Sequence, residues 1–360
     1  MIPTAQALRS AGHDVLFAGQ APVDALNPTG FPVVEVGDGS TLTDAFRRAN
    51  GRGLSFVAGE RTEEETWRMA VAGYAEHSRS ALSDLLRLAE AWRPDVLVHA
   101  TMHAAAPLVA ALLRIPTVVH NFGVSAALPI VERMAATLAD EYEIRGVTGS
   151  PDRTVLDVVP ASLGGDGSGW RVRYVPFNGG GPVPAELAAR GDRPRVAVTL
   201  GTVMRGTDLI RFLSRLTEQA ATVDAEFLLA VGDTDLTPLG ELPSNVRPLT
   251  PWVPLAQLLN ACDAVVHHGG AGSMMTAAAA GIPQLIVPQG ADNFTNAAAA
   301  EAQGFALRAE DDAVNGELLD ALLNDKGLRK AALATRDEIA TLPSPSALVA
   351  DIEGLMAAPR

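Results

Sequence analysis

The sequence predicts an α/β protein made of two doubly wound domains, and three observations support this fold class. Short apolar runs rich in β-branched residues alternate with longer helical patterns through most of the 360 residues. The strand candidates are almost continuously apolar, which is typical of parallel sheets covered by helices on both faces. The chain is also longer than the chains that usually fold around a single hydrophobic core, so two domains are expected.

The first alternating series lies in the N-terminal half of the chain. Its strand candidates are 14–18, 32–36, 95–99 and 117–120, and its helix candidates are 2–11, 41–49, 62–92 and 104–113. Thr62 and Glu65 form a T-x-x-E capping box, which predicts the start of the longest helix. The length of that segment predicts two helices or one helix with a break, although no proline marks a division.

A second series begins at residue 195. Its strand candidates are 195–200, 226–231, 246–249, 263–267 and 284–288, and its helix candidates are 208–221, 271–280 and 293–302. Glycine is dense in 146–194, which predicts a loop followed by a linker.

We therefore expect two Rossmann-like domains that face a cleft. The N-terminal domain covers 1–178, the linker 179–194 and the C-terminal domain 195–345; a last helix in 346–360 is expected to pack back on the N-terminal domain.

Composition excludes several classes of partner. The formal charge is −14, and only Lys326 and Lys330 are lysines among 28 basic residues, so nucleic acid and anionic membranes would be repelled. Cys262 is the single cysteine, which excludes an intrachain disulfide and favours a reducing cytoplasm. The first residues do not resemble a signal peptide, and no apolar run approaches the roughly 20 residues of a membrane span. The expected location is the cytoplasm.

The strongest chemical signal is the run HHGGAGS at 267–273, between a strand candidate and a helix candidate. Glycines there let the backbone approach a phosphate, and a new helix offers unpaired N–H groups and its positive end. His268 would add a side-chain donor. The alternative is a glycine-rich turn in which both histidines are merely packed.

Three further segments lie at carboxyl ends of strand candidates, where ligands of such sheets bind. The run TLGT at 199–202 could hold a phosphate or be an ordinary turn. In the run TPWVP at 250–254 two prolines fix an extended loop, where the indole could stack on a nucleobase, although a tryptophan is more often packing. The run PQGADN at 288–293 could bind sugar hydroxyls, or Asp292 could simply cap a helix.

Together these segments resemble antibiotic-type glycosyltransferases of the GT-B fold. The resemblance is carried by 195–202, 245–254 and 263–296, extends through 155–160, 173–179 and 342–345, and is densest from 245 to 296. It implies transfer of a deoxysugar from a nucleoside diphosphate, with dTDP expected, onto a polyketide or related aglycone. The implied reaction is a direct displacement with inversion that needs no metal ion and no cofactor besides the sugar nucleotide.

The resemblance also implies roles for individual residues. The diphosphate would be bound by Thr202, His268, Gly272 and Ser273, the base by Trp252 and Val253, and the sugar by Asp292 and Asn293. The family usually has Gln where Asn293 stands, so the shorter amide bears on which sugar is preferred.

The catalytic base is the part of the pattern that the sequence lacks. In the family a strand and a glycine–histidine loop precede the segment that matches 1–3, and that loop supplies the base. Met1 is therefore expected to be internal to a longer protein, and the N-terminal sheet to show a gap beside 14–18 or altered strand pairing. His99 and His103 are the alternative candidates for the base, with structural or acceptor-lining roles as the competing reading. His13 is interpreted as structural.

Two other functions share the same donor half. One is a GT-B sugar-nucleotide epimerase, and the other is a non-catalytic sugar-nucleotide-binding or auxiliary protein. The expected partners are a nucleotide sugar and a small-molecule aglycone, with a homodimer or an auxiliary protein as further possibilities. Hydride transfer is disfavoured because no G-x-G-x-x-G follows a strand candidate.

Overall fold

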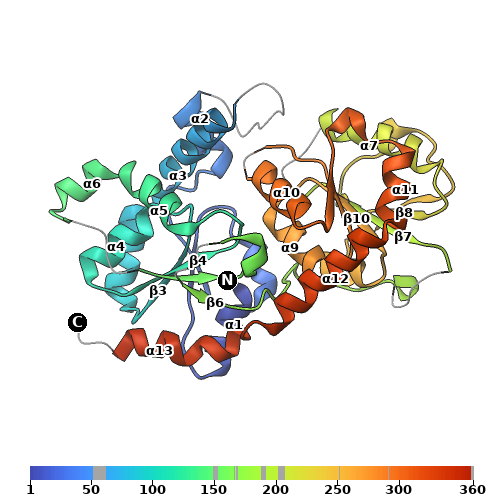
Figure 1. Ribbon diagram of the computed structural model, residues 1–360. Coiled ribbons are helices and arrows are strands. Elements are labelled where there is room, and N and C mark those ends of the chain that lie inside the picture. Colours follow the sequence, from blue (N-terminus) through green and yellow to red (C-terminus); the bar gives the residue numbers. More distant parts are fainter. Residues whose placement is uncertain are drawn as a thin grey trace. The chain divides into compact units, whose positions relative to one another are not determined.

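The computed structural model describes residues 1–51, 62–148, 153–165, 167, 169–187, 192–201, 207–250, 252–290 and 292–357. The chain divides into two compact units, unit 1 with Met1–Arg173 and Leu342–Arg360, and unit 2 with Tyr174–Thr341 (Figure 1). Every strand pair in the described ranges is parallel, and helices lie between the strands along the chain, which confirms the α/β class.

Unit 1 holds most of the first series and the C-terminal segment. Its elements are α1 (Ile2–Ser10), β1 (Phe17–Gly19), η1 (Asp24–Thr29), β2 (Val33–Glu35), α2 (Leu42–Asn50), α3 (Glu63–Trp92), β3 (Leu97–Ala100), α4 (Ala105–Leu113), β4 (Thr117–Asn121), α5 (Ala127–Ala136), α6 (Ala139–Ile144), β5 (Arg153–Asp157), η2 (Ala161–Leu163), β6 (Trp170–Arg171), η6 (Pro345–Leu348) and α13 (Val349–Ala357), where η denotes a 3-10 helix.

The strands of unit 1 form two separate sheets. One is the pair β1–β2, and the other has the order β3-β4-β5-β6. Within the described part of unit 1, no backbone ladder joins β1 to β3. The helices α3, α4 and α5 share one apolar core that includes Leu82, Leu108 and Met134.

Helix α3 is a single helix of 30 residues, so the predicted division or break is wrong. Its start is as predicted, because the Thr62 side chain accepts from the Glu65 N–H and the Glu65 side chain accepts from the Thr62 N–H. Gly73 is the position where a break would be easiest. A Cβ there would lie 2.3 Å from Cδ2 of Phe46, so this glycine admits the Phe46 ring of α2 while the helix continues.

The prediction that 146–194 lacks regular structure is wrong in part, because β5 and β6 lie in this segment. The glycines serve close packing here. A Cβ on Gly169 would lie 2.1 Å from the Val155 carbonyl oxygen, so the residue before β6 must be a glycine for the chain to lie against β5. Val155 and Leu156 of β5 are fully buried, which explains the apolar run.

Unit 2 holds the second series. Its elements are η3 (Ala185–Leu187), β7 (Arg195–Thr199), α7 (Thr207–Ala220), β8 (Glu226–Leu229), η4 (Thr237–Leu239), β9 (Val246–Pro248), α8 (Leu255–Asn260), β10 (Ala264–His267), α9 (Ala271–Ala280), β11 (Gln284–Ile286), α10 (Asn293–Ala302), β12 (Ala306–Arg308), η5 (Asp311–Ala313), α11 (Gly316–Asn324) and α12 (Lys326–Thr341).

The sheet of unit 2 has six parallel strands in the order β12-β11-β10-β7-β8-β9. Alternate residues of β7 serve two cores. Val196 and Val198 pack with α7 and α11, and Ala197 packs in the core that includes α8 and Ala277 of α9. Helices therefore cover both faces, as the continuous apolar strands predicted. The carboxyl ends of β7, β9, β10 and β11 lie at one edge of this sheet.

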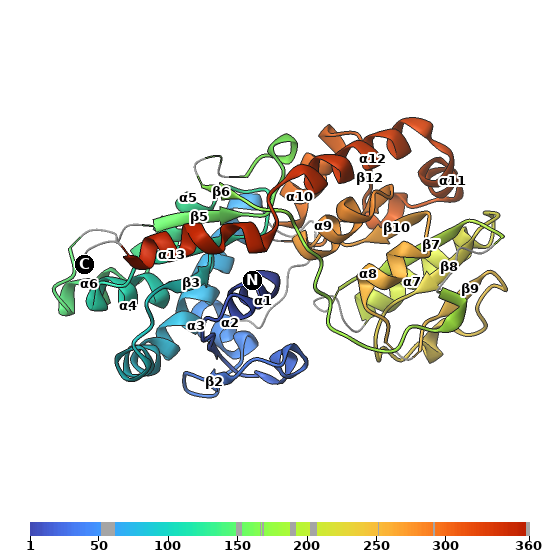
Figure 2. The ribbon, with the colours of Figure 1, turned by 90° about the horizontal axis from the view of Figure 1, so that it is seen from below.

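The end of the chain belongs to unit 1. The Arg173 N–H donates to the Pro343 carbonyl at 2.7 Å, and the His13 Nε2 lies 3.0 Å from a Glu353 carboxylate oxygen on α13. Figure 2 shows α13 in red among the elements of unit 1. His13 thus has the structural contact that its interpretation required.

Candidate functional site

The loop between β10 and α9 presents an open helix start. Gly269 has φ of +91°, which turns the chain out of β10, and Gly270 is the N-cap of α9 without any side-chain cap. The N–H groups of the first helical turn have no partner within a helix. Gly272 is exposed and Ser273 is half-buried, so an anion can reach this turn and would be stabilised there.

His268 lies between two glycines. A Cβ on Gly201, after β7, would lie 2.5 Å from Cε1 of the ring, and a Cβ on Gly270 would lie 2.5 Å from Nε2. Burial lowers the pKa of His268 to about 4, and a hydrogen bond with the Thr199 backbone partly opposes this. The ring is therefore neutral at pH 7. Within the described ranges its Nδ1 is buried and has no hydrogen-bond partner, which identifies a polar atom that a ligand could satisfy.

His267 has a structural role in the same loop. Its Nε2 lies 2.7 Å from Oε1 of Gln284, and its Nδ1 accepts from the Gly269 N–H at 3.0 Å. Burial lowers the pKa of His267 to about 3, helped by His268, so the ring stays neutral. For this first histidine the packing alternative holds: it fixes the turn from which His268 and α9 start.

Trp252 and Val253 differ in how they are placed. The Trp252 side chain is 49% exposed, and a Cβ on Gly179 would lie 3.1 Å from its Cη2, so one part of the indole rests on the segment before η3. An exposed indole has area left to stack on a planar ring. Val253 is buried in the core with α8, so only its backbone is available to a ligand.

The start of α10 lies against the β10–α9 loop. A Cβ on Gly269 would lie 3.0 Å from the Asn293 carbonyl oxygen, so the two segments touch at this glycine. Asp292 is the N-cap of α10, but its side chain does not cap the helix; instead its Oδ2 accepts from Asn296 Nδ2 at 2.9 Å. Burial raises the pKa of Asp292, and the Asn296 bond lowers it. The simple N-cap alternative is therefore wrong for this side chain.

The remaining donor-side candidate, Thr202, lies outside the described residues, and its predicted role stays a prediction. Thr199 of β7 pairs with His267 of β10, so the segment that leads to Thr202 starts beside the histidine loop. The sequence reasoning missed Asn296, which bridges two of the predicted segments. The one signal available was an amide in an otherwise alanine-rich helix.

His99 and His103 lie near the carboxyl end of β3 in unit 1. His99 is only 4% exposed, and its Nδ1 is 2.9 Å from the Ala100 carbonyl oxygen. Its Nε2 is buried and has no partner among the residues that the structure describes. His103 Nδ1 accepts from the Ala106 N–H at 3.1 Å, at the start of α4. Burial lowers the pKa of each ring to about 4. Because the Nδ1 of His103 accepts, its neutral ring carries the proton on Nε2 and is a donor there.

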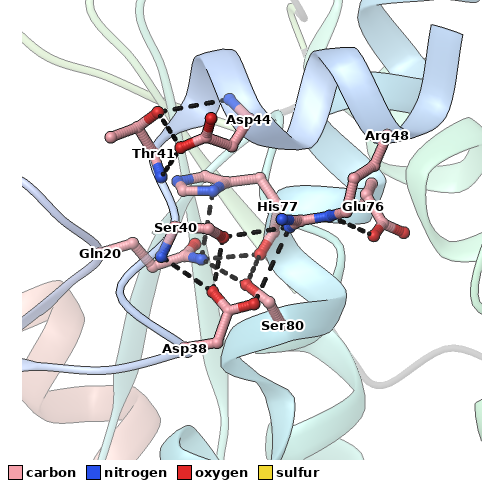
Figure 3. Close-up of polar contacts among 9 residues, drawn as sticks. All are labelled: Gln20, Asp38, Ser40, Thr41, Asp44, Arg48, Glu76, His77 and Ser80. Atoms are coloured by element: carbon pink, nitrogen blue, oxygen red, sulfur yellow. Dashed lines mark hydrogen bonds and ion pairs between the residues drawn. The ribbon is translucent and has the colours of Figure 1, made fainter. Parts of the chain in front are cut away.

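A third histidine, His77, was not singled out from the sequence. Figure 3 shows it on α3 in a polar cluster with Gln20, which follows β1. The Gln20 amide donates to the His77 carbonyl at 2.7 Å and to Ser80 Oγ at 3.1 Å, and lies 3.3 Å from His77 Nδ1. The pKa of His77 is lowered by burial and by Arg48, while Asp38 raises it. His77 also lowers the pKa of His103, so the two rings are neighbours.

The described ranges contain no group of three or more His, Cys, Asp or Glu side chains that could hold a metal ion. None of the helices described is long and apolar enough to cross a membrane. The cytoplasmic location stays a prediction.

Comparisons with known proteins place the chain in a family. The sequence matches the erythromycin biosynthesis protein CIII-like N-terminal domain over residues 6–201 and the corresponding C-terminal domain over residues 214–355. It is 38% identical over 353 residues to the elloramycin glycosyltransferase ElmGT of Streptomyces olivaceus, covering 97% of this chain and 92% of that protein.

Solved structures agree with this. The glycosyltransferase SnogD from Streptomyces nogalater superposes with a TM-score of 0.85 at 35% identity, covering 99% of this chain and 95% of that chain. The spinosyn rhamnosyltransferase SpnG, solved with thymidine diphosphate and with spinosyn aglycone, gives a TM-score of 0.83 at 30% identity, covering 98% and 95%. The chain has two α/β units with parallel strands and an open loop of histidines and glycines, and it belongs to the erythromycin biosynthesis protein CIII-like family of GT-B glycosyltransferases.

Proposed function

We propose that this chain transfers a deoxysugar from dTDP to a polyketide or related aglycone, by direct displacement at the anomeric carbon with inversion and without a metal ion. The observation that carries the proposal is the buried Nδ1 of His268, which has no hydrogen-bond partner among the described residues, beside the open start of α9. A diphosphate would accept from the N–H groups of the helix start, and from Nδ1 once that atom takes up a proton, because the single N–H of the neutral ring already bonds the Thr199 backbone. As the sugar leaves, negative charge grows on the diphosphate, and preoriented N–H groups stabilise it.

The donor would be held along one edge of the unit 2 sheet. Gly272 and Ser273 would bind the diphosphate through α9, with Thr202 from the facing loop. Trp252 would stack on thymine, and the Val253 backbone would contact it. Asp292 and Asn293 would bind sugar hydroxyls. The solved complex of SpnG with thymidine diphosphate supports the choice of nucleotide.

Unit 1 would bind the acceptor, and the SpnG complex with spinosyn aglycone supports an aglycone as that acceptor. His103 would contribute a hydrogen bond from Nε2 to the acceptor rather than act as the base, because its Nδ1 already accepts from Ala106. The base would come from a glycine–histidine loop on a strand between β1 and β3. The break between these two sheets supports this.

The test is a titration of the full chain with dTDP and UDP, followed by incubation with dTDP-sugars and an aglycone panel. Mass spectrometry and the anomeric coupling in NMR would report transfer and inversion, and EDTA should leave the rate unchanged. A folded chain that binds neither nucleotide would contradict the proposal. Epimerised donor without aglycone would indicate the epimerase. Binding without turnover, in this chain and also in a chain extended upstream, would indicate an auxiliary protein. A chain extended upstream that is no more active and melts no higher would contradict the proposed extra strand.

A further inference from the structure

Asn296 connects two segments of the donor site through one amide group. It lies in α10 and is 1% exposed. Its Nδ2 donates to the Gly269 carbonyl at 2.9 Å and to Asp292 Oδ2 at 2.9 Å. An amide nitrogen has two hydrogens, so both are used. Turning the amide over would place its oxygen against two acceptors, and the orientation is therefore fixed.

The two acceptors belong to parts of the site with different tasks. Gly269 precedes the N-cap of α9, where the diphosphate would bind, and Asp292 is the carboxylate for the sugar. Because one NH₂ group binds both, it sets the separation between them. The bond to Asp292 also lowers the pKa of that carboxyl against the effect of burial, which keeps more of it charged. The Oδ1 of Asn296 is buried and has no hydrogen-bond partner among the described residues, which by itself costs stability.

We propose that Asn296 is a positioning residue for the donor sugar, which holds the Asp292 carboxylate in place relative to the start of α9. The inference rests on the proposed function, since it takes Asp292 as the sugar ligand. It adds that sugar recognition depends on a buried side chain that does not touch the donor.

The experiment compares the dissociation constants of dTDP and dTDP-glucose for the full chain and for Asn296→Ala. The ratio of the dTDP-glucose constant to the dTDP constant should rise about tenfold in the variant, the effect of losing one hydrogen bond to a charged group. Asn245→Ala is the matched control. The Asn245 amide donates to three backbone carbonyls in unit 2, those of Ala220, Val223 and Ala225, away from Asp292. The Asn245→Ala substitution should lower the melting temperature and leave the ratio of the two dissociation constants unchanged.

A double substitution separates positioning from general loosening. In an Asp292→Asn background, Asn296→Ala should not change the ratio further, because the carboxylate that it positions is gone. As pH falls, protonation of the Asp292 carboxyl weakens sugar binding and raises the ratio of dissociation constants. In Asn296→Ala this rise should begin at a higher pH than in the wild type, because the carboxyl loses the hydrogen bond that lowers its pKa. His267, His268 and the terminal phosphate of free dTDP titrate in the same way in both proteins, so the comparison that counts is the difference between the variant and the wild type at each pH. Asn296→Ser, which keeps one donor for two acceptors, serves if Asn296→Ala does not fold.

An unchanged ratio in Asn296→Ala, or an equal change in Asn245→Ala, would overturn the inference while leaving the proposed function intact. Failure of the wild type to bind either ligand would overturn the proposed function and this inference with it.

Discussion

The imidazole of His268 occupies the space into which a side chain on Gly270 would project, with Nε2 2.5 Å from the position of a Cβ there. Gly270 has φ of −59° and ψ of 136°, which any residue adopts. The glycine is therefore required by space and not by backbone conformation, and what it makes room for is the ring that we assign to the diphosphate.

We expect Gly270→Ala to weaken dTDP binding about tenfold, because overpacking typically costs about 1–3 kcal/mol and would displace the ring. Isothermal titration calorimetry would measure this. In a His268→Ala background the same change should cost nothing further, since the methyl group fits the vacated space. Additive losses in the double variant would show that Gly270 acts independently of His268.

Trp252→Ala should reduce affinity for dTDP by roughly 5- to 150-fold, the effect of about 1–3 kcal/mol for stacking on one base. Trp252→Phe should recover much of the loss because it keeps a planar face. Trp92→Ala is the matched control, since Trp92 is 43% exposed at the end of α3 in unit 1. Equal losses in the two alanine variants would assign Trp252 to folding alone.

Sequence periodicity predicted β7, β8, β9, β10 and β11 because these strands are apolar and largely buried, but it missed β12, in which only Ala306 is buried. It also could not predict where a ladder stops. The candidate 195–200 ends at Thr199 because Thr199 pairs with His267, the last residue of β10. Strand ends depend on the partner strand, which a linear pattern does not contain. In the same way Gly169 indicated a loop, although its use is close approach to Val155.

The sequence predicted some of the site residues and missed others. It predicted the run at 267–273 because glycines and histidines between a strand and a helix have few other uses. It could not predict Asn296 or His77, because each lies inside a helix and its role depends on a contact with a distant residue, Gly269 and Gln20 respectively.

Asn293→Gln should change the preference among dTDP-sugars while leaving affinity for bare dTDP nearly constant. The longer amide would reach further from the start of α10, where the Asn293 backbone already touches the position of Gly269. Competition of several dTDP-sugars against a labelled dTDP would measure the ranking. A comparable loss for sugar nucleotides and bare dTDP would place this side chain away from the sugar.

Stability should fall in acid because histidines are buried neutral. Burial lowers the pKa of His99 to about 4 and that of His267 to about 3, below the unfolded value of 6.5. Below pH 6.5 the unfolded chain binds protons that the folded chain does not, so stability is lost as pH falls toward the folded pKa. Each such residue contributes about 1.4 kcal/mol per pH unit in this range. The free energy of unfolding, measured with urea at pH 7, 6 and 5, should change less per pH unit in His99→Gln than in the wild type. An unchanged pH dependence would contradict the neutral burial of His99.

Donor binding should take up a proton at His268. Burial lowers the pKa of this ring to about 4 in the free protein, and a diphosphate beside its Nδ1 would raise that pKa, since a nearby negative charge favours the charged ring. The complex then binds more protons than the free protein, so affinity should increase as pH falls from 8 to 6, by at most tenfold per unit.

dTDP-glucose is the ligand to use, because its esterified diphosphate lacks the terminal group that titrates near neutral pH. Calorimetry in buffers of different ionisation enthalpy would count the protons, up to one for the wild type and none for His268→Ala. The Asp292 carboxyl has the opposite sign, since its protonation weakens sugar binding in acid, so it cannot imitate the effect. Equal proton uptake in the two proteins would show that the diphosphate does not lie against His268.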